Sequence, residues 1–544
     1  MTVTEQKRKN ITFAWQFAGI FLYLFTIAVA LVGLVYLVWS FVLMIQRFYE
    51  VPFQNIMILE FILNLITLLV EFLGVFYTVM LLNHMASTCM NPPSLTKRET
   101  IIENYPTVSI LIPIRHPEYE ILRETLVSIS EVDYPKEKLT VFLGDDTEKK
   151  HESYLKTVEL AQYYNAQHIH DPSNIHFKAG MLNVVLKHVT SEFFILLDYD
   201  HKIEPMLITK SVKLLMNNSQ LAFVQSKVNF RLVKSKLQVW ESVMYAQFYE
   251  VFQRSKTKHS TVLTNGSTAC YRKSYVDEIG GIPFDTFTED IDISVKLLAK
   301  GYKTELVDEY GSFGLIPANF SLLLSQILRW AKGSMQVLRL RWKKILSAKM
   351  PFIHRIDLLF SASLFFIAAS VYLNLVFYVI MYFTNSSVVR LPMSVFPPLL
   401  IMPIAFAVSY QLSGIIAVLY ARRSGIRNLK LFDLVYFLIL ALVLNPFTVY
   451  AVFKSMFNRK IPSRDRDEWN EKIPYIILSL IISILGGGLI TISIFDILSN
   501  GFTGSFWLIL GLLGLTMLAT FPVCIFFHFS TKHNKPYFVK EINT

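Results

Sequence analysis

The sequence is poor in charge and in cysteine. Only 17% of its 544 residues are charged, whereas 53% are hydrophobic, which excludes an ordinary soluble enzyme and is typical of a membrane protein with a polar insert. The three cysteines, Cys89, Cys270 and Cys524, have neither metal-ligand nor disulfide spacing. This cysteine usage fits a chain that faces the reducing cytosol.

Several motifs are missing as well. The glycine-rich fingerprints of dinucleotide-binding and P-loop proteins are absent, so NAD and ATP chemistry are not expected. No basic stripe is interleaved with aromatic residues, so we expect no nucleic-acid partner. The net charge of +11 is explained by basic loops that would face anionic lipid, such as Lys454–Arg466. His168, His170 and His176 lie close together but match no common zinc spacing.

Long apolar runs are abundant, and each is near or above the ~20 residues that a spanning helix needs. They are Trp15–Ile45, Ile56–Leu82, Leu358–Phe383, Val395–Ala421, Phe432–Phe453, Ile473–Leu498 and Phe506–Phe529. No such run occurs between Asn83 and Pro351. This central stretch is long enough for one α/β domain with its own core.

The charges around these runs predict the topology. Basic residues Lys7–Lys9 precede the first run, so we expect an uncleaved anchor with a cytosolic amino end, and two crossings then return the chain to the cytosol. Phe432–Phe453 lies between two basic loops and contains Asn445-Pro446. It is therefore interpreted as a re-entrant or interfacial hairpin, which leaves six crossings of the plasma membrane and a cytosolic central domain.

These patterns divide the chain into five segments. They are two transmembrane helices in 1–90, a cytosolic α/β domain in 91–316, amphipathic interfacial helices in 317–350, transmembrane and re-entrant helices in 351–530, and a short cytosolic tail in 531–544. In the second apolar run, Glu60, Asn64 and Glu71 share one helix face. Such polar residues either line a hydrophilic conduit or hydrogen-bond to neighbouring helices.

Two acids follow a predicted buried strand. The apolar run Phe193–Leu197 is followed by Asp198 and Asp200, whose i, i+2 spacing lets both carboxylates reach one divalent cation. Ligands bind at the carboxyl ends of strands in open α/β sheets. The alternative is a pair of solvated loop acids.

Further polar groups follow other predicted elements. Strands are predicted at Thr107–Pro113 and Lys138–Leu143, and the second ends before Asp145 and Asp146. Lys178, close to Gly180 at a predicted helix start, suits an anionic ligand.

Acids and an arginine-tryptophan pair mark two later helices. Glu289 and Asp290 open an apparent helix over Ile293–Ala299, where an acid can also be a simple cap. Gln326 and the pair Arg329-Trp330 lie on the amphipathic stretch 319–340. They suit stacking on a sugar or nucleotide, whereas an interfacial aromatic beside a snorkelling arginine is the alternative.

Taken in order, these motifs resemble the signature of processive glycosyltransferases of family 2, the group of cellulose, hyaluronan and chitin synthases. The motifs are Asp145-Asp146, Lys178–Gly180, Asp198–Asp200, Thr288–Asp290 and Gln326–Trp330. The resemblance implies an α/β GT-A glycosyltransferase domain inserted in an α-helical transmembrane bundle. It also implies a UDP-sugar donor and a growing polysaccharide that crosses the lipid bilayer.

The resemblance also implies roles for individual residues. The catalytic base would be Asp290, with Glu289 beside it, and Mg2+ or Mn2+ would be held by Asp198 and Asp200. The donor would be bound by Asp145, Asp146, Lys178, Asp198, Gln326, Arg329 and Trp330, and the acceptor by Asn265, Gly266, Ser267 and Trp330. The channel would be lined by Glu60, Asn64 and Glu71.

The sequence departs from this group at several points. Many relatives carry Asn-Glu where this sequence has Arg115–Glu118. The gating segment of cellulose synthases is missing from the corresponding region, around Lys460–Lys472. No regulatory domain is expected after the last apolar run. The expected activity is metal-dependent inverting polymerisation of a β-linked polysaccharide from a UDP-sugar. Transfer of a single sugar to a lipid acceptor and an inactive transporter or scaffold are the alternatives, and the sugar and any accessory subunits stay open.

Overall fold

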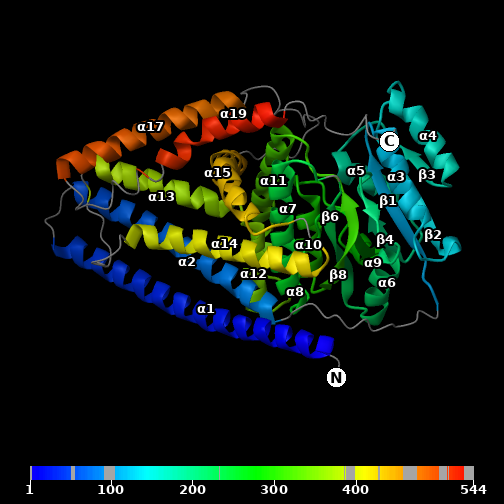
Figure 1. Ribbon diagram of the computed structural model, residues 1–544, viewed down its shortest axis with the longest axis horizontal. Coiled ribbons are helices and arrows are strands. Elements are labelled where there is room, and N and C mark those ends of the chain that lie inside the picture. The colour runs from blue at the N-terminus through cyan, green and yellow to red at the C-terminus, as the bar shows by residue number, and fades with distance from the viewer. Residues whose placement is uncertain are drawn as a thin grey trace.

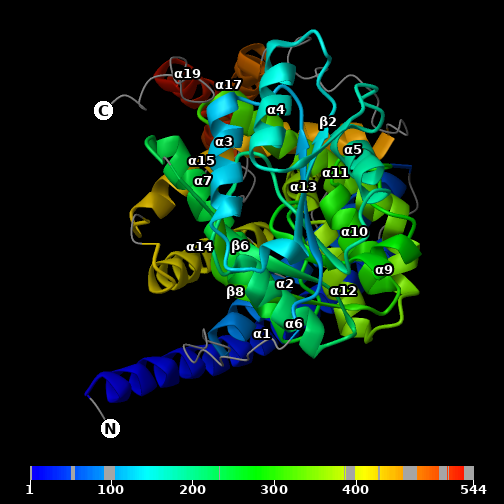
Figure 2. The same cartoon turned by 90° about the vertical axis from the view of Figure 1, so that its right-hand side faces the viewer.

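The computed structural model describes residues 3–50, 55–90, 104–231, 233–384, 386, 398–426, 429–457, 475–500, 511 and 514–531. An eight-stranded sheet with its helices occupies one end of the molecule, and long apolar helices occupy the other (Figure 1). Figure 2 views the molecule from the sheet end, with the apolar helices behind. The expected α/β domain among apolar helices is therefore confirmed.

The sheet has the strand order β3-β2-β1-β4-β7-β6-β8-β5. Its strands are β1 (Val108–Ile114), β2 (Leu139–Asp145), β3 (Gln167–His170), β4 (Phe193–Leu196), β5 (Lys202–Ile203), β6 (Leu221–Phe230), β7 (Ala269–Arg272) and β8 (Lys303–Gly314). The first four strands of this order are parallel, and β7 is antiparallel to both β4 and β6. The strands predicted from apolar runs are confirmed as β1, β2 and β4, because sheets covered on both faces require continuous apolar strands.

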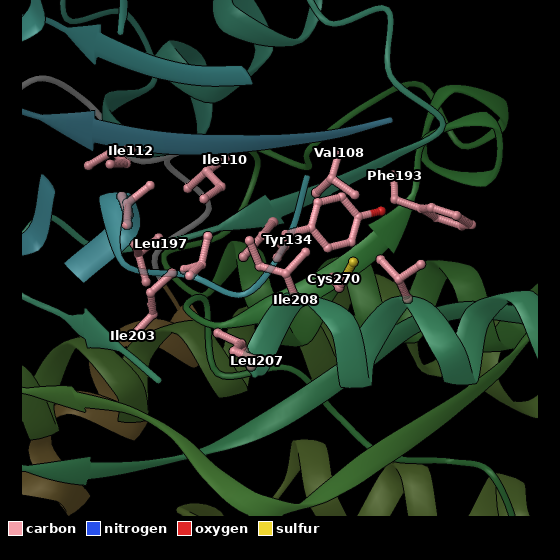
Figure 3. Packing of buried hydrophobic residues seen from close by; sticks show 14 of the residues in the cluster. Val108, Ile110, Ile112, Tyr134, Phe193, Leu197, Ile203, Leu207, Ile208 and Cys270 are labelled. Carbon is pink, nitrogen blue, oxygen red and sulfur yellow. The ribbon is translucent and has the colours of Figure 1, made fainter. Parts of the chain in front are cut away.

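Helices cover both faces of this sheet. They are α3 (Tyr119–Ser130), α4 (Glu152–Tyr163), α5 (Phe177–Leu186), α6 (Leu207–Asn217), α9 (Lys273–Glu278) and α10 (Glu289–Ala299). On β1, Ile110 packs in a cluster with Ile208 of α6, whereas the next residue, Leu111, packs in a second cluster with Leu182 of α5. Figure 3 shows the first cluster, in which Ile110, Val108 and Phe193 face Ile208. The alternation of side chains along β1 thus fills two cores.

A helical layer lies between the sheet and the apolar helices. It contains α7 (Lys236–Gln247), the π-helical segment η2 (Phe248–Gln253), α8 (Arg254–Thr257), α11 (Phe320–Leu346) and α12 (Phe352–Ala362). The predicted amphipathic stretch is α11, whose start is capped by the Asn319 side chain accepting the Leu322 N–H. Both α7 and α11 contact α15, so this layer joins the sheet to the apolar helices.

The apolar helices are α1 (Val3–Glu50), α2 (Asn55–Met90), α13 (Phe366–Phe383), α14 (Pro398–Arg423), α15 (Asp433–Phe457), α17 (Tyr475–Asn500) and α19 (Thr520–Thr531). Within the described part of the chain, five helices are long and apolar enough to cross a membrane: Thr12–Glu50, Ile58–Met90, Ala405–Arg423, Asp433–Phe457 and Tyr475–Ser499. Residues 458–474 and 532–544, which include the expected gating region and most of the tail, lie outside the described residues.

The apolar run Leu358–Phe383 is not one helix, contrary to expectation. It is interrupted at residues 363–365, between α12 and α13. At the interruption, the Tyr77 hydroxyl of α2 donates to the Ser363 carbonyl at 2.9 Å and lies 2.6 Å from the Ser363 hydroxyl. A polar side chain from a neighbouring helix therefore satisfies the backbone that the break exposes.

The expected hairpin at Phe432–Phe453 is wrong. α15 is one continuous helix that contains Pro446 and does not turn back at Asn445. Proline is tolerated within apolar helices, because neighbouring groups can satisfy the backbone group that it frees. Figure 1 shows α15 nearly end-on, and it contacts α11, α13 and α14. An interfacial position for this helix stays a prediction.

Candidate active site

Lys178 connects three segments at the carboxyl edge of the sheet. It lies in the first turn of α5, after His176 and Phe177, which have left-handed backbone angles. The Lys178 ammonium donates to the Asp198 carboxylate at 2.6 Å and to the Gly266 carbonyl at 2.9 Å. Burial acts to lower the pKa of Lys178, but the Asp198 and Glu289 charges outweigh it and raise that pKa. Lys178 is therefore charged and can bind an anionic ligand.

Asp198 and Asp200 emerge together where β4 ends, with His201 beside them. One ligand atom from each of these three residues lies within 4.8 Å of the others. His201 was missed in the sequence, although it directly follows Asp200. Its Nδ1 lies 3.1 Å from the Ser312 hydroxyl of β8, which orients the ring.

The charges of this cluster fit a divalent cation. Burial acts to raise the pKa of Asp198, yet Lys178 and His201 hold it below its usual value. Burial raises the pKa of Asp200, and the Asp198 charge adds to the increase. The negative charge of Asp198 and Asp200 together is thus not fully compensated by the neighbouring cations. Two carboxylates with an imidazole are suitable ligands for Mg2+ or Mn2+.

Asp290 lies in the first turn of α10 and faces the same cleft. A Cβ on Gly266 would lie 3.3 Å from the Asp290 carboxylate and 3.6 Å from the Lys178 ammonium, so these three residues are close neighbours. Burial and the adjacent Glu289 charge raise the pKa of Asp290 to about 7. A carboxylate with this pKa is suited to accept a proton at neutral pH.

The segment containing Gln326, Arg329 and Trp330 lies on α11, near the acids described above. Gln326 donates through Nε2 to the Tyr245 hydroxyl of α7 at 3.1 Å, and the Trp330 ring meets the Tyr245 ring edge-on at 5.8 Å. The Arg329 side chain is exposed, and its charge lowers the pKa of both Asp198 and Asp290. Tyr245 was not predicted, because nothing in its local sequence distinguishes it from a packing aromatic.

The acids at the end of β2 are both buried. Asp145 is fully buried, accepts the Thr147 N–H at 2.8 Å and lies 2.9 Å from the His168 Nε2. Asp146 is also buried and lies 3.9 Å from Arg115. Contacts within the protein therefore engage Asp145, and its contact with a donor stays a prediction, as does that of Asp146.

The predicted acceptor residues form a turn beside Lys178. Gly266 has φ +83°, which favours glycine, and the Asn265 amide donates to the Tyr249 hydroxyl. The Ser267 hydroxyl accepts the Asp198 N–H at 3.0 Å. The turn thus positions Asp198, and its contact with an acceptor stays a prediction.

The predicted channel residues lie on α2, apart from the site. Glu60 lies 3.7 Å from Arg47, and Asn64 donates to the Glu60 carbonyl at 2.9 Å. Glu71 accepts hydrogen bonds from Tyr36 of α1 at 3.1 Å and Tyr378 of α13 at 2.5 Å. Interhelical hydrogen bonding accounts for Glu71, and a conduit along this face stays a prediction.

Comparison with known families places this site in a class. The family model of "Glycosyl transferase family group 2" matches residues 193–529, which is more than half of the chain. The chain therefore belongs to this family, and the resemblance noted in the sequence is confirmed at the family level. The mixed sheet with helices on both faces and acids at its carboxyl edge is the GT-A-like fold that the resemblance implied.

Curated relatives give a more particular likeness. The chain is 28% identical over 243 residues to the UDP-forming catalytic subunit of cellulose synthase 1 from Komagataeibacter xylinus, covering 44% of this chain and 32% of the relative. It is 28% identical over 242 residues to the UDP-forming cellulose synthase catalytic subunit from Pseudomonas fluorescens (strain SBW25), with the same coverage of each. The match thus spans about a third of the length of these relatives.

Solved structures show a partial likeness. The mannosyltransferase PcManGT from Pyrobaculum calidifontis, in complex with GDP-Man and Mn2+, has a TM-score of 0.47 and 18% identity, covering 73% of this chain and 100% of that one. TarS 1–349 from S. aureus, in complex with UDP-GlcNAc, has a TM-score of 0.35 and 16% identity, covering 64% and 88%.

Proposed function

We propose that the protein is a membrane-embedded, processive, inverting glycosyltransferase that polymerises a β-linked polysaccharide from a UDP-sugar and translocates it. The observation that carries this proposal is the meeting of Lys178, Asp198 and Asp290 at one edge of the sheet. The relatives described as UDP-forming cellulose synthases favour UDP-glucose as donor and a β-glucan as product. The candidate membrane helices favour export across the bilayer, with the site on the cytosolic side.

The site residues divide into those that bind the leaving group and one that accepts a proton. Lys178 and Arg329 are placed to bind the donor diphosphate, and their charges stabilise it more as the glycosidic bond breaks and negative charge grows. Asp290 then accepts the proton of the attacking hydroxyl. A single displacement opposite the leaving group converts an α-linked donor into a β-linked product.

The acidic cluster provides for a metal. Asp198, Asp200 and His201 would hold Mg2+ or Mn2+, which when bound neutralises the diphosphate of the leaving group. The Ser267 hydroxyl and the Lys178 ammonium keep Asp198 oriented for this role. Gln326 and Trp330, together with Arg329, would close over the diphosphate and position the terminal sugar of the acceptor.

The test is UDP release by detergent-purified protein with Mg2+ or Mn2+. The donors are UDP-glucose, UDP-N-acetylglucosamine, UDP-glucuronate and UDP-galactose, offered singly and in pairs, and product length is measured on a gel. Asp290→Asn is the inactive variant, and Asp277→Asn, an exposed acid of α9 paired with Lys273, is the matched control. We expect long product from one donor or pair, lost only in Asp290→Asn; UDP release without polymer would contradict processivity.

A further inference from the structure

One buried acid of α7 has no part in the chemistry described above. Glu241 is completely buried, and neither carboxylate oxygen has a hydrogen-bond partner among the described residues. Burial raises the pKa of this carboxyl well above its usual value, which favours its protonated form. In that form the carboxyl both donates and accepts a hydrogen bond. A buried polar group without a partner costs stability, which points to a partner that arrives with a ligand.

Glu241 lies near a residue of α7 that contacts α11, Tyr245. It precedes Tyr245 by one helical turn, so the two side chains share a face. Tyr245 accepts a hydrogen bond from Gln326 Nε2, and the Gln326 Oε1 is buried with no hydrogen-bond partner in the described part of the chain. Burial raises the pKa of Tyr245, whereas the charge of Arg329 lowers it. Tyr245 therefore lies between Glu241 and the catalytic site.

The unpaired atoms suit a sugar. Each hexose hydroxyl donates and accepts, as the neutral Glu241 carboxyl does, and a second hydroxyl can donate to the Gln326 Oε1. The edge-on pair of Trp330 and Tyr245 offers aromatic surface for the apolar face of a pyranose ring. A few convergent polar groups beside aromatic rings are typical of a small-molecule subsite.

We propose that Glu241, with Tyr245 and Gln326, forms the subsite that binds the second sugar of the acceptor chain, behind the terminal unit that Asp290 deprotonates. This assignment rests on the proposed function, because only a polymerase holds an acceptor of this kind. Occupancy of this subsite would keep the product in place between additions. Glu241 is thus an acceptor-binding residue and takes no proton from the substrate.

The variants are Glu241→Leu, which fills the site without a polar group, and Glu241→Gln, which keeps hydrogen bonding. Ser242→Ala is the matched control, because Ser242 is buried on the same helix and its hydroxyl donates to the Gln238 carbonyl of its own helix. The probe is cellotriose, chosen because the relatives are cellulose synthases. Two readouts are used: the rise in melting temperature that cellotriose causes, which needs no turnover, and the KM for cellotriose against the KM for UDP-glucose.

For Glu241→Leu we expect a higher melting temperature than wild type without ligand, since an unpaired buried acid is removed. The rise caused by cellotriose should disappear, and the KM for cellotriose should increase about tenfold while that for UDP-glucose changes less than twofold. Glu241→Gln should retain part of the binding. A lower melting temperature with an unchanged KM for cellotriose, or a wild type that cellotriose does not stabilise, would overturn the assignment. Cellotriose binding that depends on Glu241 without UDP release would overturn the polymerase alone.

Discussion

At the scale of single residues, the pKa of Asp290 predicts how activity depends on pH. The base must be deprotonated, and burial with the Glu289 charge raises its pKa to about 7. We therefore expect kcat/KM for the donor to be constant well above pH 7 and to fall below it, approaching about tenfold per pH unit. Asp290→Asn should lower kcat by about 10²- to 10⁴-fold at every pH.

The check is a pH profile of UDP release between pH 5 and 9 under saturating acceptor. The Asp277→Asn variant should retain the wild-type profile, because this acid is exposed and pairs with Lys273 far from the cleft. A wild-type profile that stays flat down to pH 5 would remove Asp290 from the role of base.

Gly266 gives a second prediction at this scale. Its φ of +83° disfavours any larger residue, and an added Cβ would lie 3.3 Å from Asp290 and 3.6 Å from Lys178. Gly266→Ala should therefore strain the turn and displace the base, lowering kcat by more than about tenfold.

Gly280→Ala is the matched control for Gly266→Ala. Gly280 has a similar φ of +86°, but an added Cβ meets nothing within 4 Å. The control variant should thus lose a comparable part of its stability and keep its kcat. Equal kcat values for the two variants, measured as UDP release by folded protein, would show that crowding of Asp290 is unimportant.

Residues whose chemistry stands out in the sequence were predictable, whereas the residues that contact them and hold them in place were not. Asp198 and Asp290 come together as their positions at a strand end and a helix start implied. Tyr245 and His168 act through contacts made by distant segments, a hydrogen bond from Gln326 and a contact with Asp145. No local pattern encodes such pairings, because they depend on how elements pack.

At the scale of elements, an ion pair couples the helix of the base to the helix of the Gln-x-x-Arg-Trp segment. Arg341 of α11 donates to both carboxylate oxygens of Asp292 of α10, at 2.8 and 2.9 Å, and also contacts Asp285. Asp292 is fully buried, so removing its partner leaves a buried charge. Arg341→Met should lower the free energy of unfolding by about 3 kcal/mol.

Thermal unfolding of the detergent-purified variants measures this effect. Lys344→Met is the control, because Lys344 is an exposed cation on the same helix; its melting temperature should match wild type. An unchanged melting temperature for Arg341→Met would mean that packing alone holds α10 against α11.

Elements with one strong signal were predicted and those that depend on context were not. The apolar runs of β1, β2 and β4 identified strands because both faces of that half of the sheet are covered. α15 was misjudged because Asn445-Pro446 is typical of a helix break, whereas the helix continues through Pro446. The break between α12 and α13 depends on Tyr77 of α2, which no local sequence rule includes.

At the scale of the whole molecule, buried charges join the catalytic sheet to the apolar helices. Lys227 of β6 pairs with Glu250 of η2 at 3.0 Å, and Arg254 of α8 pairs with the same carboxylate at 2.6 Å. Arg254 also lies 5.2 Å from the ring centre of Tyr420 on α14. A buried network with several partners resists relative movement of the parts it joins. The sheet is thereby held at a constant position relative to α14.

The path of the product is the last property that belongs to the whole molecule. If the face of α2 that carries Glu60 and Asn64 lines a conduit, Glu60→Leu with Asn64→Leu should slow export and leave chemistry intact. We expect UDP release in detergent to change less than twofold, while polymer inside inverted membrane vesicles falls about tenfold. Glu71→Gln is the comparison, because Glu71 bonds Tyr36 and Tyr378 across helices and its loss should lower thermal stability instead. Export that is unaffected in the folded double variant would mean that these residues, like Glu71, hold helices together and that the polymer takes another route.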